Sequence, residues 1–143
     1  MTELAGEGLF SHREALLGQR DSNAVTHEKF RRRARILQRL EIGAAIAPLA
    51  AAAAIALPSA IEEHDPGKIE KPAMVGWIVA MLSIGVTDLI KNRQVAKARR
   101  VAADTASICE ELSVPMDPWV VKGYREWREY QAARNNLNAN RYF

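Results

Sequence analysis

Hydrophobic residues gather in two long stretches of the chain. Residues 42–61 hold twenty positions without a charge, and residues 73–90 hold a single charged side chain, Asp88. A helix needs roughly 20 apolar residues to cross the ~30 Å hydrocarbon core of a bilayer. Both stretches are close to that length. The pattern therefore predicts two transmembrane helices, one over each stretch.

The segment between the two stretches is a short acidic turn. Residues 62–71, EEHDPGKIEK, hold four acids, only two of the chain's twenty Lys and Arg residues, and the turn dipeptide Pro66-Gly67. The outer flanks, at residues 20–39 and 91–100, are instead strongly basic. Loops on the cytoplasmic side of a membrane carry an excess of Lys and Arg. This asymmetry predicts a hairpin with both termini on the cytoplasmic or matrix side.

A polar helix is predicted to lead into the first span. Capping residues at positions 21–23 and again at Thr26 place its start between these two points. Its apolar residues Phe30, Ala34 and Leu37 recur three and four positions apart, and arginines fill much of the remaining circumference. The helix is therefore expected to be basic and amphipathic, and to continue into the span without a break.

The second span is also predicted to continue as a polar helix. No helix breaker follows residue 90 until Pro115, so the helix is expected to end at about Leu112. Cys109 lies on its predicted packing seam and is expected to be a buried small hydrophobe. The seam consists of Val95, Ala98, Ala102, Thr105, Cys109 and Leu112. We expect it to pack against the apolar face of the helix that precedes the first span.

The two ends of the chain have different patterns. Residues 1–23 combine glycines with mixed charge, which predicts an extended arm with one short helix over residues 12–17. The first ten residues lack the apolar core of a secretory signal, so we expect none there. At the other end, Asp117 and Pro118 supply an N-cap and a first-turn proline for a final helix that reaches about Arg134.

These patterns together predict an all-α fold class. We expect a two-span transmembrane helical hairpin with juxtamembrane helical extensions and a C-terminal amphipathic helix. The expected domains are an N-terminal arm over residues 1–23, the helical hairpin over 24–112, and an aromatic, basic helix and tail over 113–143. Because the first span is rich in alanine, it has an alternative interpretation as a buried helix of a soluble bundle.

Small residues and prolines mark positions within the spans. The pairs Gly43 with Ala47 and Gly76 with Ala80 have the small-xxx-small spacing that allows membrane helices to approach closely. They are therefore predicted helix-packing residues, either between the two spans or against a neighbouring subunit. The prolines are Pro48, expected to kink the first span, Pro58, expected near the far interface, and Pro72, expected in the first turn of the second helix.

Basic and aromatic side chains next to the spans are predicted to contact anionic phospholipids or a partner protein. The predicted contact residues are Arg31, Arg32, Arg33, Trp119, Tyr124 and Trp127. The arginine run has a simpler interpretation as a solvated stop at the membrane interface, where such residues are common. No nucleic-acid partner is expected, because the basic runs contain no recognised reading motif.

Asp88 is the single ionisable residue within the two predicted spans. An acid inside a membrane is a candidate functional site, so Asp88 is a possible intramembrane polar site. It also lies close to the inner end of the second span and one helical turn before Lys91. An interfacial acid paired with Lys91 is the alternative.

The remaining composition predicts no catalytic chemistry. The chain has one Cys and three scattered His, which give neither a disulfide nor metal-ligand spacing. Paired carboxylates, a nucleophile with its base and a phosphate loop are all lacking from the sequence pattern. We therefore expect no enzyme activity, no cofactor, no metal site and no small-molecule substrate.

The favoured functional hypothesis is a non-catalytic accessory subunit of a large membrane complex of the respiratory or ATP-synthase type. Its expected partners are other subunits of that complex and anionic phospholipids. The expected location is the mitochondrial inner membrane rather than a bacterial plasma membrane. The layout of basic helix, span, short loop, span and polar helix over residues 30–112 is similar to that of bacterial SLATT-type two-span effectors. That resemblance implies the alternative function, a self-associating membrane effector or pore-forming protein.

Overall fold

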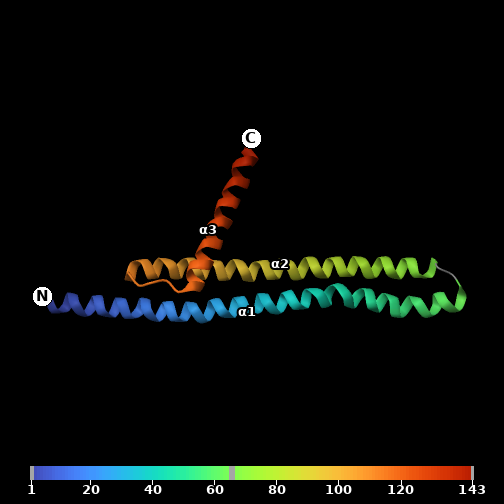
Figure 1. The fold of residues 1–143 in the computed structure, drawn as a ribbon, viewed down its shortest axis with the longest axis horizontal. Coiled ribbons are helices and arrows are strands. Elements are labelled where there is room, and N and C mark those ends of the chain that lie inside the picture. The colour runs from blue at the N-terminus through green and yellow to red at the C-terminus, as the bar shows by residue number, and fades with distance from the viewer. Residues whose placement is uncertain (1, 65–66, 143) are drawn as a thin grey trace. The chain divides into compact units, whose positions relative to one another are not determined.

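The described part of the protein is helical apart from short connections. A computed structural model describes residues 2–64 and 67–142 and places in them α1 (Thr2–Glu63), α2 (Gly67–Leu112), α3 (Pro118–Ala139) and the short 3-10 helix η1 (Asn140–Tyr142), as Figure 1 shows. The predicted all-α class is confirmed. Both α1 and α2 are long and apolar enough to cross a membrane.

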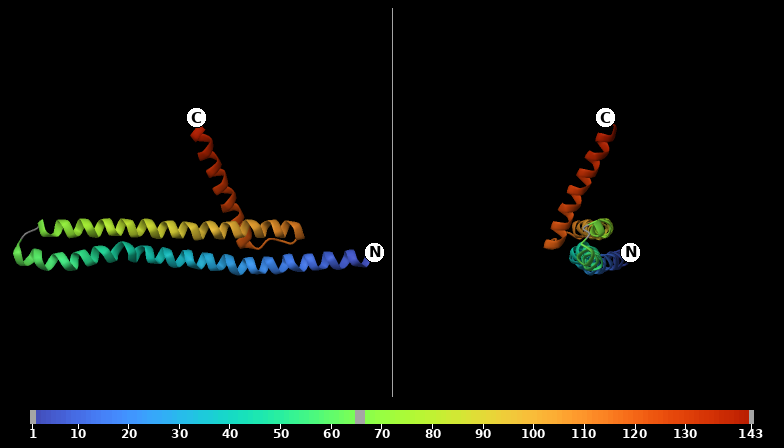
Figure 2. Two further views of the ribbon diagram at one scale, coloured as in Figure 1. Left: turned by 180° about the vertical axis from the view of Figure 1, so that it is seen from behind. Right: turned by 90° about the vertical axis from the view of Figure 1, so that its right-hand side faces the viewer.

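The chain divides into two compact units. We call Met1–Arg32 with Gln94–Phe143 the three-helix unit, and Arg33–Arg93 the two-helix unit. Helices α1 and α2 contribute a segment to each unit, whereas α3 belongs to the three-helix unit alone. Within each unit the segments of α1 and α2 lie side by side and run in opposite directions (Figures 1 and 2).

Helix α1 begins much earlier than the sequence pattern predicts. The prediction of an extended arm over residues 1–23 is wrong for residues 2–23, because the helix runs unbroken from Thr2; residue 1 lies outside the described residues. Each glycine costs a helix only about 1 kcal/mol, and the residues between the glycines are mostly good helix formers. The segment is also tied to α2, since His12 Nε2 lies 3.1 Å from Glu111 Oε1. Packing on a neighbour stabilises helices that would be marginal alone.

The capping residues that suggested a later start have other roles within α1. The Asn23 side chain donates a hydrogen bond to Thr105 Oγ1 on α2, at 3.1 Å. Thr26 donates back to the carbonyl oxygen of Ser22, at 2.9 Å, as hydroxyl side chains often do inside helices. Residues that resemble an N-cap in the sequence therefore serve packing and local hydrogen bonding here.

Helix α2 ends where the sequence predicts, at Leu112, but begins earlier. It starts at Gly67, so Pro72 lies inside the helix and not in its first turn. After Leu112, Ser113 adopts a left-handed conformation with φ 53°. The backbone N–H groups of Ser113 and Val114 donate to the carbonyls of Glu110 and Cys109, at 3.2 and 3.0 Å. This is a Schellman motif, which satisfies carbonyls at the end of the helix.

Helix α3 starts as predicted and ends later. Asp117 is its N-cap and Pro118 its first residue. The backbone carbonyl of Asp117 accepts hydrogen bonds from the N–H groups of Val120 and Val121, at 2.9 and 3.2 Å. The helix continues past the predicted end at Arg134 as far as Ala139. Residues 135–139, the first part of the polar tail, are therefore helical.

The predicted seam of α2 forms the core of the three-helix unit. Ala98, Ala102 and Thr105 are fully buried, and Cys109 retains only 2% of its exposure. Val120 of α3 is buried with them, at 1%. The prediction that this seam is a packing surface is confirmed. The sequence pattern did not indicate that α3 also packs in this unit.

Candidate functional site

Small residues line the contact between α1 and α2 in the two-helix unit. A Cβ atom built on Gly76 would lie 2.7 Å from the Ala52 Cβ and 3.1 Å from the carbonyl oxygen of Pro48. Ala56 and Ala60 of α1 and Ala80 of α2 are buried along the same contact surfaces. The contact residues on each helix recur every four positions, so they form one face. Their size lets the two backbones approach closely.

The other predicted packing pair does not lie at this contact. Gly43 and Ala47 are both exposed, and a Cβ atom on Gly43 would meet nothing within 4 Å. The four-residue repeat on α1 runs instead through Pro48, Ala52, Ala56 and Ala60. The structure therefore joins Gly76 and Ala80 to the α1–α2 contact, and leaves Gly43 and Ala47 on the outer surface of the unit.

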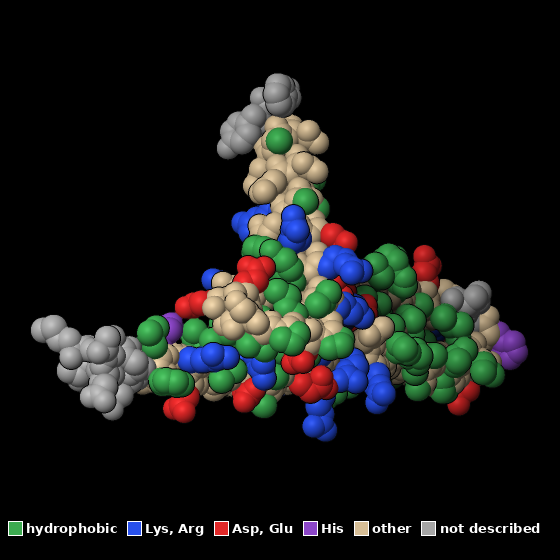
Figure 3. Space-filling model, turned by 60° about the vertical axis from the view of Figure 1, so that its left-hand side comes forward, with side chains coloured by type: hydrophobic (Ala, Val, Ile, Leu, Met, Phe, Trp, Pro, Cys, Tyr) green, Lys and Arg blue, Asp and Glu red, His purple; other side chains and the backbone are tan. Residues whose placement is uncertain are grey.

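Large apolar side chains cover the outside of the two-helix unit. Ile55 is 73% exposed, Leu82 is 65% exposed and Trp77 is 58% exposed. On the face drawn in Figure 3, hydrophobic side chains gather over the paired segments of α1 and α2. A water-soluble protein has the opposite arrangement, with large aliphatic residues buried. The two-helix unit thus has small residues inside and large apolar residues outside.

A polar cluster joins the two helices near one end of the predicted spans. Lys91 Nζ lies 2.7 Å from Asp88 Oδ1 and 2.9 Å from Glu41 Oε2 on α1. Asn92 also donates to the Asp88 carboxylate, at 3.2 Å. The hydrogen bond to Asp88 raises the pKa of Lys91 most, and the hydrogen bond to Glu41 raises it further. Asp88 and Lys91 therefore pair as their spacing predicts, and Glu41 adds a second carboxylate that the sequence did not indicate.

A close crossing of α2 and α3 lies in the three-helix unit. A Cβ atom on Gly123 would lie 2.4 Å from the Ala102 Cβ, closer than real Cβ atoms approach. His27 of α1 packs beside this crossing, with its ring 4.5 Å from that of Trp119. His27 is 7% exposed, and its Nε2 has no hydrogen-bond partner among the described residues. Helices α1, α2 and α3 therefore meet here, in what we call the three-helix junction.

One carboxylate on α3 binds arginines from both other helices. Glu126 Oε2 accepts hydrogen bonds from Arg31 Nη2 at 2.8 Å and from Arg99 Nε at 3.4 Å. Partial burial acts to raise the pKa of Glu126, but the hydrogen bonds and charges of Arg31 and Arg99 outweigh it and lower that pKa. The carboxylate thus remains charged and links α1, α2 and α3 one helical turn from Gly123.

The predicted lipid or partner contacts divide into two groups. Arg31 and Trp119 are engaged within the chain, with Glu126 and His27. Arg32 and Arg33 are exposed. Tyr124 and Trp127 are half-buried and stack on each other, with ring centroids 6.1 Å apart. Arg31 and Trp119 therefore have partners within the three-helix unit, which the sequence pattern did not indicate.

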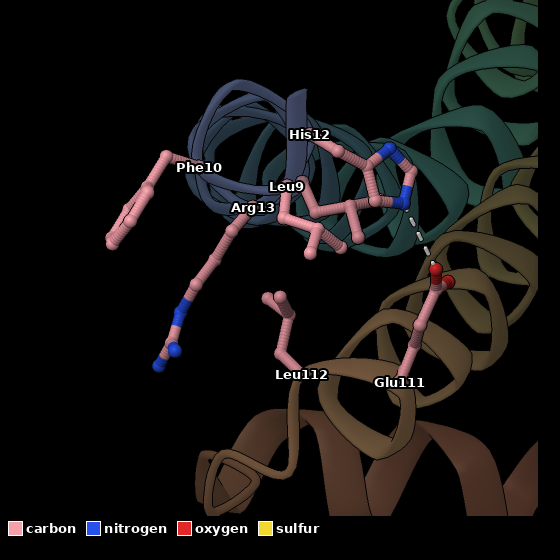
Figure 4. Close-up of a pocket in the computed structure, with 7 residues that line it drawn as sticks. Leu9, Phe10, His12, Arg13, Glu111 and Leu112 are labelled. Atoms are coloured by element: carbon pink, nitrogen blue, oxygen red, sulfur yellow. Dashed lines mark hydrogen bonds and ion pairs between the residues drawn. The ribbon is translucent and has the colours of Figure 1, made fainter. Parts of the chain in front are cut away.

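An apolar cleft of about 500 Å³ separates the N-terminal part of α1 from the end of α2. Figure 4 shows Leu9 and Leu112 directed toward each other from the two helices, and Phe10 directed away from them. His12 reaches across to Glu111 beside this cleft. Leu9 and Phe10 are 71% and 74% exposed, so the cleft is open to its surroundings.

Three residues of the junction were missed by the sequence pattern, namely His27, Gly123 and Glu126. Only Gly123 has a local signal. A glycine inside a helix costs about 1 kcal/mol relative to alanine and often marks a close approach. His27 and Glu126 become important only because α3 packs against α1 and α2. No periodicity within a single helix contains that information.

The burial of His27 predicts a pH-dependent stability. Desolvation, and then the charge of Arg31, lower the pKa of His27 below its ordinary value of 6.5. The folded protein therefore binds fewer protons than the unfolded chain as pH falls below 6.5. The contribution of neutral, buried His27 to the stability of the fold is complete above pH 6.5. It is lost as pH falls from there through the folded pKa of His27. We expect chemical unfolding at pH 5.5 to need less denaturant than at pH 7.5.

Replacing this side chain should reduce that pH dependence. In His27→Gln the difference in unfolding midpoint between pH 7.5 and 5.5 should be smaller than in the wild type. His64 is an exposed control with φ 50°, a conformation that asparagine tolerates, so His64→Asn should retain the wild-type pH dependence. Equal pH dependence in the wild type and His27→Gln would show that His27 is not responsible.

The described residues contain no group of three or more His, Cys, Asp or Glu side chains placed to hold a metal ion. The features described above are the small-residue contact, the three-helix junction and two ion-pair clusters. One cluster is centred on Lys91 and the other on Glu126. No family model, curated protein or solved structure matches the chain.

Proposed function

We propose that the protein is a non-catalytic, integral membrane subunit that acts by helix packing within a larger membrane complex. The carrying observation is the two-helix unit, where small residues face inward and large apolar residues face outward. Burying a leucine or isoleucine is worth about 1.5–3 kcal/mol in water. Exposing many such side chains to water would therefore cost a large part of a protein's stability, whereas a bilayer solvates them.

The composition of the first span supports a role in a larger assembly. Alanine is close to neutral in transfer to a bilayer, so this span gains little from lipid alone. The outward position of Gly43 and Ala47 leaves a second small-residue surface, where another helix can approach closely. We propose that this surface contacts a neighbouring subunit. A respiratory or ATP-synthase complex of the mitochondrial inner membrane is the proposed setting, with both termini on the matrix side.

Purification of the tagged protein from its native membrane tests this proposal. Alkaline carbonate should leave the protein in the membrane pellet. Mild detergent should then release it with a fixed set of other membrane subunits. Release by carbonate would contradict membrane insertion, and a homo-oligomer without other subunits would instead favour the SLATT-like effector.

Variants of the outward surface make the test specific. In Gly43→Leu with Ala47→Leu, the other subunits should be lost while the internal fold persists, because nothing lies within 4 Å of the Gly43 Cβ position. Ala53 is also exposed on α1 and provides a matched control. Ala53→Leu should retain the partners. Loss of partners in both variants, or in neither, would contradict the assigned surface.

A further inference from the structure

A basic groove of about 470 Å³ lies between α2 and α3 in the three-helix unit. Figure 1 shows α3 leaving α2 at a steep angle, and the groove follows from this divergence. Its charged lining residues are Arg99, Arg100 and Asp104 of α2, and Arg134 of α3. Three arginines and one aspartate give the lining a formal net charge of +2.

The three arginines of the groove differ in how they are paired. Arg99 contacts Glu126 through Nε, at 3.4 Å, and its two Nη groups form no ion pair with the described residues. Among the described residues, Arg100 and Arg134 form no ion pair. Guanidinium groups that share a groove without enough carboxylates repel one another. A bound anion would relieve this repulsion.

Aromatic side chains form another part of the groove. Trp127 and Tyr130 line it, and Gln131 adds a polar amide. The stacking of Trp127 on Tyr124 fixes one of these rings in place. An aromatic wall beside arginines accommodates the uncharged part of a ligand next to its anionic group.

We propose that this groove binds a phosphate group. Guanidinium groups form paired hydrogen bonds with phosphate oxygens, which gives arginine its preference for this anion. A phosphate monoester carries about −1.5 to −2 charges at neutral pH, which matches the +2 lining better than a single carboxylate does. The phosphate belongs to either a phospholipid headgroup or a soluble phosphate compound, and the two sources share this chemistry. The site is additional to the proposed packing function.

Two binding measurements on the full-length protein in uncharged detergent distinguish the sources. The first titrates inorganic pyrophosphate by calorimetry. The second titrates micelles that contain phosphatidic acid, against micelles that contain phosphatidylcholine only. Saturable binding in the first measurement identifies a soluble phosphate ligand. Binding of phosphatidic acid without binding of pyrophosphate identifies a lipid headgroup.

The variant Arg100→Gln with Arg134→Gln should weaken the observed binding by about tenfold or more. The control Lys122→Gln with Arg125→Gln also removes two exposed positive charges, both on α3 and outside the groove. It should change binding by less than about twofold. Protection of the buried Cys109 from thiol reagents verifies that each variant is folded. Absence of wild-type binding in both measurements, or equal losses in the two variants, would overturn the proposal.

Discussion

Replacing Gly123 with valine is expected to loosen the three-helix junction by about 2 kcal/mol. The first added carbon would already lie 2.4 Å from the Ala102 Cβ, so α2 and α3 must move apart. Overpacking of this kind typically costs 1–3 kcal/mol. Valine gains little helix propensity over glycine in compensation. The buried Cys109, two turns from Ala102 on the same face of α2, should react with thiol reagents roughly thirtyfold faster.

Two further variants separate overpacking from a general effect of substitution. Gly18 lies in α1 of the same unit with nothing within 4 Å of its Cβ position, so Gly18→Val should leave the Cys109 reaction rate within about twofold of wild type. The exchange of Ala102→Gly with Gly123→Ala moves one methyl group across the crossing. In this double variant, Cys109 should react with thiol reagents more slowly than it does in Gly123→Val. A thirtyfold increase in Gly18→Val, or none in Gly123→Val, would contradict the close crossing.

Helix boundaries could be predicted from the sequence wherever prolines and capping residues within one segment mark them. The α2 end at Leu112 and the α3 start after Asp117 follow from prolines and capping residues. The start of α1 could not be predicted in the same way. Its first twenty residues are ordinary in helix propensity, and their pairing with α2, where His12 Nε2 lies 3.1 Å from Glu111 Oε1, is not visible in the local pattern. Such contacts depend on how helices pair.

In the candidate sites, too, contacts within one helix could be predicted from the sequence, and contacts between helices could not. The spacing of Asp88 and Lys91 predicts their ion pair, because both lie on one helix. The partners of Arg31 and Trp119 lie 95 residues later and 92 residues earlier in the chain. These partners become neighbours only when α3 packs on the other helices. The sequence thus indicated which side chains are able to form polar and aromatic contacts, and the packing of α3 determined which of them face inward.

Replacing Glu126 with glutamine is expected to destabilise the three-helix unit by about 1–3 kcal/mol at neutral pH. Glutamine retains the shape of the side chain but removes the charge that holds Arg31 and Arg99, which would then lie close together without a counterion. The side chains of Glu126 and Arg31 are only 24% and 28% exposed, so solvent screens this contact less than a surface pair. The readout is again the rate at which Cys109 reacts with thiol reagents, which should increase about five- to 150-fold for a loss of 1–3 kcal/mol.

The pH dependence of this difference distinguishes the charge of Glu126 from its packing. Because the folded pKa of Glu126 is lowered from 4.5, its stabilisation is complete above pH 4.5 and is lost as pH falls from there through the folded pKa. Wild type and Glu126→Gln should therefore converge in denaturant midpoint at acidic pH, since a protonated carboxyl group resembles the amide. Glu129→Gln removes an exposed carboxylate on the same helix and should match wild type at every pH. A constant difference between Glu126→Gln and wild type down to pH 3 would assign the effect to packing instead of charge.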